Sequence, residues 1–362
     1  MPNLKKIISH FDIKGTTATA EPLGNGLIND TYKVATAEPD APDYVLQRIN
    51  DKVFTNVDLL QANIDAVTLH IRRKLMQQGE TDIDRKVLRF LTADTGKSYV
   101  RADDSSYWRM SVFIPRTRTL DIVDPHSSEC AGEAFGRFES MLVDLPESLG
   151  ETIPGFHDME LRISQLRQAV NSDAAHRLGE VKQMVEAIEA QASEMCKAEH
   201  LHREGLLPKR VCHCDTKVNN MLFDEDGKVL CVIDLDTVMP SYVFSDFGDF
   251  LRTAANTVAE DCPDIDDVDF KMDIFRAFAK GYLRSALSFL SPIEIENLPY
   301  AAALFPYMQC VRFLADYING DTYYKTSYPE HNLVRAKNQW RLFEKVEARM
   351  PEMHSFISSC CQ

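Results

Sequence analysis

The sequence lacks any long apolar run. No stretch approaches the roughly 20 consecutive apolar residues that a bilayer-spanning helix needs, so we expect no membrane segment. The N-terminal residues also lack an apolar run followed by a small-residue cleavage site, which argues against a signal peptide. Both absences favour a cytoplasmic protein that has no membrane partner.

The chain has fewer basic than acidic residues. The chain has 40 Lys and Arg residues against 55 Asp and Glu residues, which gives a formal net charge of -15. Because a protein that binds nucleic acid needs a basic surface for the phosphate backbone, we expect no nucleic-acid partner. A single nucleotide remains compatible with this charge, since a metal ion and a few local cations can neutralise its phosphates.

Paired cysteine motifs are also missing. The nine cysteines are an odd number and are scattered along the chain, and Cys212, Cys214 and Cys231 fall inside apolar segments. Reduced thiols are therefore expected. The spacing Cys212-His213-Cys214 has no second ligand pair at zinc-site spacing, so we expect no structural metal.

The length and the N-terminal pattern predict two lobes, because 362 residues exceed one ordinary hydrophobic core. Two strands are predicted at residues 27–36 and 43–50, joined by a turn-rich segment. A helix is predicted at 56–76, where apolar residues recur every three or four positions. Two more strands are predicted, at 86–93 and 106–114. The first lobe is therefore expected to be β-rich with one helix.

From about residue 121 onward the apolar pattern is mostly helical, with one β interruption. At 219–236, Asp226-Gly227 indicates a hairpin turn between two apolar strands. We predict an α+β protein with a two-lobed, protein-kinase-like fold. Residues 1–115 form a small antiparallel β lobe that binds a nucleotide, and residues 116–362 form a large, mainly α lobe that carries the hairpin, the catalytic site and the acceptor pocket.

The residues that predict chemistry flank this hairpin. The segment HCDTKVNN precedes it and contains Asp215, Lys217 and Asn220, and Asp234 ends its second strand. Phosphoryl transfer needs a carboxylate for the attacking hydroxyl, a cation near the transferred group and oxygen ligands for Mg²⁺. We predict Asp215 as the catalytic base that contacts the acceptor, Lys217 as the phosphate-neutralising cation, and Asn220 with Asp234 as the Mg²⁺ ligands.

Three further residues are predicted to support this segment rather than to contact substrate. His213 is expected to hold the loop. Asp246 and Asp249 of the DFGD sequence follow Asp234, which already fills the metal role, so we expect them to brace the loop by hydrogen bonds.

These motifs resemble a known family. HCDTKVNN, followed by VIDLDTVMP and DFGDFLR, is similar to the catalytic and metal-binding segments of aminoglycoside phosphotransferase-like kinases, which include choline kinases. The longer runs HCDTKVNNML, IDLDTVMPSYVFSDFGDFLR and VRFLADYINGDTYYKTSYPEHNLVRAKNQ resemble bacterial N-acetylhexosamine 1-kinases more closely. The likeness extends from about Gly24 to about Gln339, and its C-terminal motifs are the more specific ones.

The resemblance implies a kinase that uses ATP and Mg²⁺. It implies the same roles for Asp215, Asn220 and Asp234, and it adds sugar contacts from Arg312 and Tyr323. This chain has Leu27 and Thr253 where N-acetylhexosamine 1-kinases have a histidine and a phenylalanine. Both positions are expected near the sugar, which leaves the preference for an acetamido group open.

Nucleotide contacts are predicted in the first lobe. The segment LGNGLIND contains Gly24, Gly26 and Asn29, and its glycines would allow the backbone to approach phosphates. Gln47 stands where kinases of this superfamily often have a lysine, and Arg48 lies next to it on the opposite strand face. Asp65, on the following helix, stands where an acidic partner is expected, although a solvated helix face explains it equally well.

Three functions are consistent with the sequence. The first is transfer of phosphate from ATP to the anomeric hydroxyl of an N-acetylhexosamine or related hexose. The second keeps this chemistry with an amino alcohol or another small alcohol as the acceptor. The third is an inactive nucleotide-binding scaffold, against which the complete set of catalytic residues argues. We expect a monomer or a weak homo-oligomer.

Overall fold

The computed structural model describes residues 3–24 and 29–361, so Gly26 and Leu27 lie outside the described residues. The chain divides into two compact units. The sheet unit consists of Met1–Thr119, Asp144–Pro154 and Met221–Met239. The helical unit consists of Leu120–Val143, Gly155–Asn220 and Pro240–Gln362. The division into lobes after residue 115 stays a prediction.

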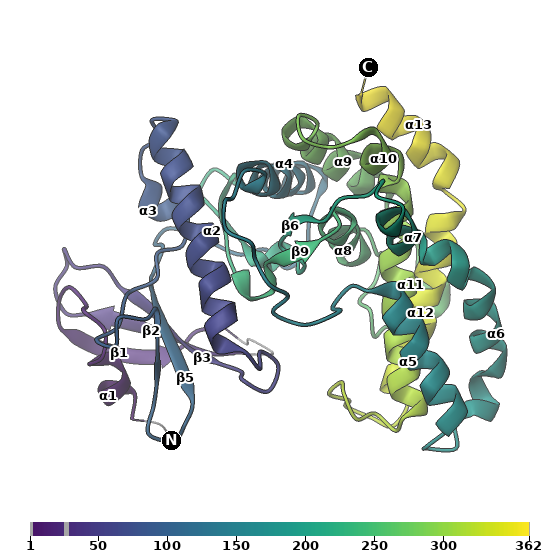
Figure 1. Cartoon of the computed structure of the whole chain (residues 1–362), viewed down its shortest axis with the longest axis horizontal. Helices are drawn as coiled ribbons and strands as arrows, with labels where there is room; N and C mark the ends of the chain where they lie inside the picture. Colours follow the sequence, from purple (N-terminus) through teal and green to yellow (C-terminus); the bar gives the residue numbers. More distant parts are fainter. Residues whose placement is uncertain (1–2, 25–28, 362) are drawn as a thin grey trace. The chain divides into compact units, whose positions relative to one another are not determined.

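The sheet unit is built on a five-stranded antiparallel sheet (Figure 1). Its order is β1 (Thr17–Pro22), β2 (Asp30–Thr36), β3 (Tyr44–Ile49), β5 (Tyr107–Val112) and β4 (Tyr99–Arg101). Successive side chains of a strand point to opposite faces of the sheet. On one face of the central strands, Val34, Leu46, Trp108 and Met110 form a buried apolar core that packs with α1 (Leu4–Ile8). The opposite face carries Gln47, whose pairing partners in the sheet are Thr31 and Arg109.

One strand prediction needs correction. Residues 86–93 do not form a strand, because they bridge β5 only at Phe90 and then leave it to bridge Phe11 at Ala93. The fourth predicted strand is confirmed as β5, but β4 pairs with it instead. The edge strand β1 was not predicted, since its small and polar residues are mostly exposed and carry no apolar pattern.

The predicted helix is confirmed as α2 (Val57–Gln77), the long helix of the sheet unit in Figure 1. Asn56 caps it by accepting a hydrogen bond from the N–H of Leu59 at 3.0 Å. The apolar stripe predicted for one face is buried throughout: Val57, Leu60, Ile64, Val67, Ile71 and Leu75. A short helix, α3 (Ile83–Lys86), follows.

The predicted hairpin is also confirmed. β7 (Met221–Phe223) and β8 (Val229–Val232) pair antiparallel, and Gly227 in their turn has φ +79°. This is the left-handed region that glycine adopts at little cost. The short helix η2 (Leu235–Thr237) follows the hairpin. Residues 221–239 belong to the sheet unit, and the assignment of this hairpin to a large lobe stays a prediction.

The helical unit consists mainly of α-helices, as predicted. Two of them, α11 (Leu298–Ile318) and α12 (His331–Glu347), lie side by side (Figure 1). The predicted capping box is present at α10 (Pro292–Glu296), where Ser291 and Glu294 bond reciprocally. The other elements of this unit are α4 (Pro125–Leu142), α5 (Met159–Ser172), α6 (Leu178–Met195), α7 (Lys197–Arg203), β6 (Arg210–Cys212), η1 (Val218–Asn220), β9 (Met239–Ser241), α8 (Phe244–Ala254), η3 (Ile265–Asp267), α9 (Met272–Ala286) and α13 (Met350–Cys360).

Helices α4 and α9 approach each other so closely that only glycine fits between them. A Cβ atom on Gly281 would lie 2.0 Å from the carbonyl oxygen of Glu129, and one on Gly132 would lie 2.1 Å from that of Phe278. Both obstacles are backbone atoms, so the helices would have to move apart to admit a methyl group.

We therefore expect Gly281→Ala to lower the free energy of unfolding by about 3 kcal/mol, the upper part of the range for overpacked sites. Urea unfolding followed by circular dichroism measures this. Gly179→Ala on α6 is the matched control, because its added Cβ would meet no neighbouring element within 4 Å in the described structure and alanine favours helix. Equal stability of the two variants would show that α4 and α9 separate without cost.

None of the helices in the described parts of the chain combines the length and apolar character that crossing a membrane requires.

Candidate active site

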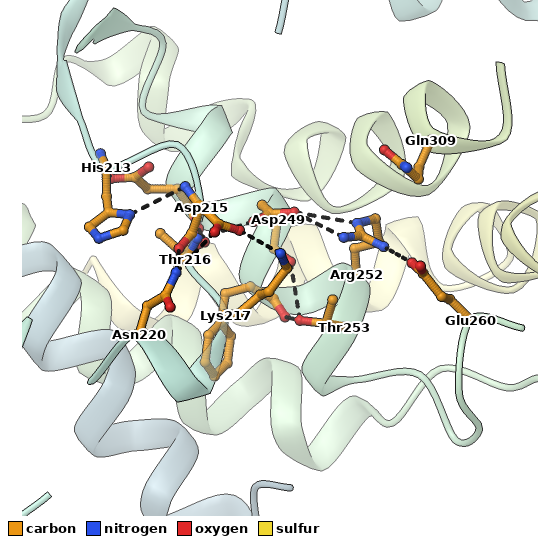
Figure 2. A network of polar contacts seen from close by, with 12 residues as sticks. His213, Asp215, Thr216, Lys217, Asn220, Asp249, Arg252, Thr253, Glu260 and Gln309 are labelled. Atoms are coloured by element: carbon orange, nitrogen blue, oxygen red, sulfur yellow. Dashed lines mark hydrogen bonds and ion pairs between the residues drawn. The ribbon is translucent and has the colours of Figure 1, made fainter. Parts of the chain in front are cut away.

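The segment that carries Asp215 forms a loop between β6 and η1 in the helical unit (Figure 2). Lys217 Nζ lies 2.9 Å from Asp215 Oδ1. The side-chain amide of Asn220 donates to Asp215 Oδ2 at 3.0 Å and to the Asp215 carbonyl oxygen at 2.8 Å. The structure thus brings together three of the four residues predicted to carry the chemistry.

Helix α8 braces this loop, as predicted from the DFGD sequence. Asp246 accepts hydrogen bonds from the N–H groups of His213 and Cys214, both at 2.7 Å, and Asp249 accepts one from the N–H of Thr216 at 3.1 Å. These bonds fix the backbone on both sides of Asp215. Cys214 has φ +63°, an uncommon conformation for a non-glycine residue, which persists because the bonds around it determine it.

His213 supports the loop from inside the protein. Its side chain is completely buried, and its ring lies edge-on to Phe135 and Phe138 with centroids 5.7 and 5.9 Å away. Its Nδ1 accepts a hydrogen bond from the N–H of Asp215 at 3.3 Å. This geometry matches the predicted role of holding the loop.

A buried acidic pair lies beneath the loop. Glu139 of α4 and Asp246 are fully enclosed together with Cys212, and their ligand-type atoms lie within 4.8 Å of one another. Burial and the charge of Asp246 raise the pKa of Glu139 well above its ordinary value. The hydroxyl of Tyr282 also contacts Glu139. We interpret Glu139 as a neutral acid that supports Asp246, since two adjacent buried charges would be very costly.

The electrostatics suit a general base. Burial opposes ionisation of Asp215, but the charge of Lys217 and its hydrogen bond hold the pKa of Asp215 below the usual aspartate value. Burial likewise opposes the charge of Lys217, whereas Asp215 and Asp249 together raise the pKa of this lysine. Asp215 is therefore an anion and Lys217 a cation at neutral pH. An ionised carboxylate can accept the proton of an attacking hydroxyl.

The two predicted metal ligands present suitable oxygen atoms. Asn220 uses its Nδ2 for Asp215, and its Oδ1 has no hydrogen-bond partner among the described residues. Asp234, in the sheet unit, is exposed and has φ +59° and ψ +56°. Aspartate tolerates this left-handed conformation better than most non-glycine residues, and Asp82, Asp173 and Asp321 also have positive φ. Carboxylate and amide oxygens are ligands that Mg²⁺ accepts, so these residues fit the predicted ion.

The sheet unit contains a polar network that the sequence pattern did not reveal. Arg109 of β5 forms a buried ion pair with Asp236, with Nη1 2.5 Å from Oδ1, and donates to Gln47 at 3.0 Å and Gln61 at 3.1 Å. Asn29 donates to the other oxygen of Asp236 at 2.6 Å. Two predicted nucleotide contacts, Gln47 and Asn29, are thereby joined to the segment that follows Asp234.

Gln47 stands where kinases of this superfamily often have a lysine, and the network places the guanidinium of Arg109, from the neighbouring strand, beside it. The signal for it was a single arginine on the non-core face of an otherwise apolar strand. Arg48 lies on the other face, where it is 47% exposed and 3.5 Å from Asp30. Asp65 is not a purely solvated residue, because it accepts a hydrogen bond from Ser98 at 2.7 Å and burial raises its pKa.

Residues 19–287 match the family model of the phosphotransferase enzyme family, APH. The chain belongs to this family. The matched range includes the braced loop, Asp234 and the Arg109 network. The prediction of a phosphotransferase of the aminoglycoside phosphotransferase type is therefore confirmed.

Solved structures share the fold of this phosphotransferase. An aminoglycoside phosphotransferase from Alicyclobacillus acidocaldarius has a TM-score of 0.63 at 14% identity, with 99% of this chain and 97% of that one covered. An amicoumacin kinase in complex with AMP-PNP, Ca²⁺ and Ami has a TM-score of 0.59 at 14% identity, with coverage of 94% and 92%. A Plasmodium vivax ethanolamine kinase has a TM-score of 0.53 at 14% identity, with coverage of 89% and 82%. These similarities confirm the predicted protein-kinase-like α+β fold.

The Arg109 ion pair should matter for the stability of the phosphotransferase. We expect Arg109→Leu to lower the free energy of unfolding by about 3–5 kcal/mol, because Asp236 would remain buried without its counter-charge. Urea unfolding gives the value. Arg48→Leu, which removes an exposed pair, should cost about 1 kcal/mol or less. If Arg109→Leu costs no more than this control, the buried pair contributes nothing to stability.

The two residues predicted to contact the sugar differ in how far they are buried. Arg312 is a partly buried residue of α11, whereas the side chain of Tyr323 is 69% exposed and its ring meets Tyr324 edge-on at 4.8 Å. Tyr324 is the tyrosine whose ring lies beside the Arg312 guanidinium, at 5.6 Å. Thr253 donates its hydroxyl to the carbonyl oxygen of Phe250 at 3.2 Å. Gly24 is described and has φ +71°, and among the described residues no atom lies within 4 Å of where its Cβ would be.

Proposed function

We propose that this phosphotransferase moves the γ-phosphate of ATP, with Mg²⁺, to the anomeric hydroxyl of an N-acetylhexosamine or related hexose, giving a sugar 1-phosphate. The observation that carries the phosphotransfer is the ionised Asp215, paired with Lys217 at 2.9 Å on a loop that α8 braces. The choice of acceptor is supported by the resemblance of the C-terminal motifs to N-acetylhexosamine 1-kinases.

In this proposal Asp215 receives the proton of the attacking hydroxyl and orients its oxygen toward the phosphorus atom. Lys217 keeps Asp215 ionised and adds positive charge next to the transferred group. Asn220 keeps Asp215 in place through two hydrogen bonds from Nδ2 and offers Oδ1 to the metal. Bound Mg²⁺, held by Asn220 and Asp234, would neutralise the phosphate oxygens of the nucleotide.

ATP is proposed as the donor because of the family and because a similar fold binds AMP-PNP in the amicoumacin kinase. The proposed nucleotide contacts are Gly24, Gly26, Asn29, Gln47 and Arg48, of which Gly26 lies outside the described residues. The Arg109 network supports two of them, since it fixes Gln47 and, through Asp236, Asn29.

A screen of free sugars and amino alcohols for ADP release with MgATP tests the proposal. We expect a hexose to be phosphorylated and choline and ethanolamine not to be. Phosphorus NMR of the product then identifies the position, because a 1-phosphate couples to the anomeric proton and a 6-phosphate couples to a methylene pair. A 6-phosphate product, or turnover with amino alcohols alone, would exclude the sugar 1-kinase.

A further inference from the structure

The guanidinium of Arg312, on α11, is held in place by neighbouring side chains, but no described carboxylate is paired with it. Its Cζ lies 5.5 Å from the ring centroid of Phe156 and 5.6 Å from that of Tyr324, so two aromatic rings hold it in place. Its Nη1 donates a hydrogen bond to Gln309 Oε1 at 3.1 Å. Among the described residues no carboxylate lies at ion-pairing distance from it, so most of its N–H donors have no protein partner.

A second arginine lies close to the first. Arg162 of α5, a helix that packs against α11, donates to the carbonyl oxygens of Phe156 at 2.6 Å and Gly155 at 3.0 Å, and to Gln165 at 2.9 Å. Within the described chain it too has no acidic partner at ion-pairing distance, and its buried Nε has no hydrogen-bond partner. Burial and the neighbouring charge of Arg312 lower the pKa of Arg162 to about 10. The Arg312 guanidinium therefore disfavours the charged form of Arg162.

The buried His157 lies within electrostatic range of both arginines and of Asp215. His157 is stacked on Phe156 with centroids 4.3 Å apart, and its pKa is lowered by burial and by Arg312 while Asp215 opposes that shift. Its Nδ1 is a second buried atom without a partner among the described residues. Gln309 of α11, which accepts a hydrogen bond from Arg312, is labelled in Figure 2, where no dashed line joins it to Asp215 or Arg252.

The two arginines lie in a chain that has more acidic than basic residues, which gives it a net charge of -15. By composition alone, the neighbour of an arginine would more often be acidic than basic. Arg162 has a structural task, since it holds the backbone at residues 155–156, but Arg312 makes no comparable backbone bond among the residues described. Two adjacent guanidiniums would repel a cationic acceptor and would attract an anion, which arginine binds with two parallel hydrogen bonds.

We propose that the acceptor is an anionic hexose derivative, whose carboxylate or phosphate group is bound by Arg312 and stabilised by Arg162. This inference rests on the proposed function and narrows its acceptor. The anionic group provides the counter-charge that the arginine pair lacks, and the anomeric hydroxyl of the same molecule is then presented to Asp215.

The test compares acceptors that differ only in the group at C6, which is neutral or anionic: glucose with glucuronic acid and with glucose 6-phosphate, and galactose with galacturonic acid. N-Acetylglucosamine and choline complete the set. We expect at least one anionic sugar to have a kcat/KM about tenfold or more above that of its neutral parent. The uronic acids and the hexose phosphate distinguish a carboxylate from a phosphate as the bound group.

Variants then assign the preference to the arginines. Arg312→Gln should bring kcat/KM for the anionic sugar down to that of the neutral parent, mainly through KM, and should lower kcat/KM of the neutral parent by a smaller factor than that of the anionic sugar. Arg167→Gln is the matched control, because Arg167 lies on the same helix as Arg162 but pairs with Glu189 at 2.7 Å. This variant should retain the preference.

The outcomes separate this inference from the proposed function. A neutral hexose or N-acetylglucosamine that exceeds every anionic sugar, with Arg312→Gln affecting both kinds equally, would overturn the anionic acceptor and leave the sugar 1-kinase intact. Turnover with choline alone would overturn both. If no sugar is phosphorylated, the proposed function fails, and calorimetric titration of glucuronate and glucose 6-phosphate into the wild type and Arg312→Gln still decides whether the pair binds an anion.

Discussion

Replacing Asp215 with asparagine should lower turnover by about 10² to 10⁴ while the protein stays folded and binds nucleotide normally. Asparagine has the same shape and can still accept the hydrogen bond from Asn220 through its oxygen. It cannot accept the proton of the attacking hydroxyl. The measurements are kcat from ADP release, the melting temperature, and the affinity for MgATP.

The pH dependence offers a second measurement of the same base. Activity requires ionised Asp215, and Lys217 holds the pKa of this carboxyl below the usual aspartate value despite burial. Activity that depends on this group should therefore persist below the pH at which an ordinary aspartate is half protonated. If the Asp215→Asn variant turns over at a rate close to that of the wild type, at any pH, another group removes the proton.

The second large effect concerns Asp234. We expect Asp234→Asn to abolish measurable turnover and to weaken binding of MgATP, since one of few anionic metal ligands would be lost. Asparagine is the informative substitution because Asp234 has φ +59°, a conformation that asparagine tolerates and alanine does not favour. The backbone is then preserved and only the charge changes.

Calorimetric titration of MgATP measures this loss, and repeating it with ATP and EDTA isolates the contribution of the metal. Asp226→Asn is the control, because Asp226 is an exposed aspartate in the turn of the same hairpin. It should behave as the wild type. Unchanged MgATP affinity together with unchanged activity in Asp234→Asn would refute its assignment as a metal ligand.

Local signals explain what the sequence predicted correctly. Asp226-Gly227 specifies a turn by itself, and the stripe from Val57 to Leu75 specifies one buried helix face, so both elements are confirmed. The loop around Asp215 was also recognisable, because its residues lie within a few positions of one another.

Residues that depend on distant partners could not be predicted in the same way. Arg109 acquires its importance from Asp236, and Arg162 from Arg312, and the members of each pair are more than 100 positions apart. Likewise, residues 86–93 and β4 both pair with β5, and only β4 does so as a strand. The local sequence of either segment does not show which of them will form that strand.

The glycine contact between α4 and α9 also affects how the protein is made. Gly132 and Gly281 are about 150 positions apart, so a ribosome that adds about 5–20 residues per second delivers α9 about 8–30 s after α4. During that interval the surface of α4 that packs against α9 has no partner. This surface is the one on which the backbones of the two helices later come into close contact. Synthesis therefore leaves α4 exposed to aggregation or chaperone binding until α9 appears, and the helical unit must complete this part of its core after translation of residue 286.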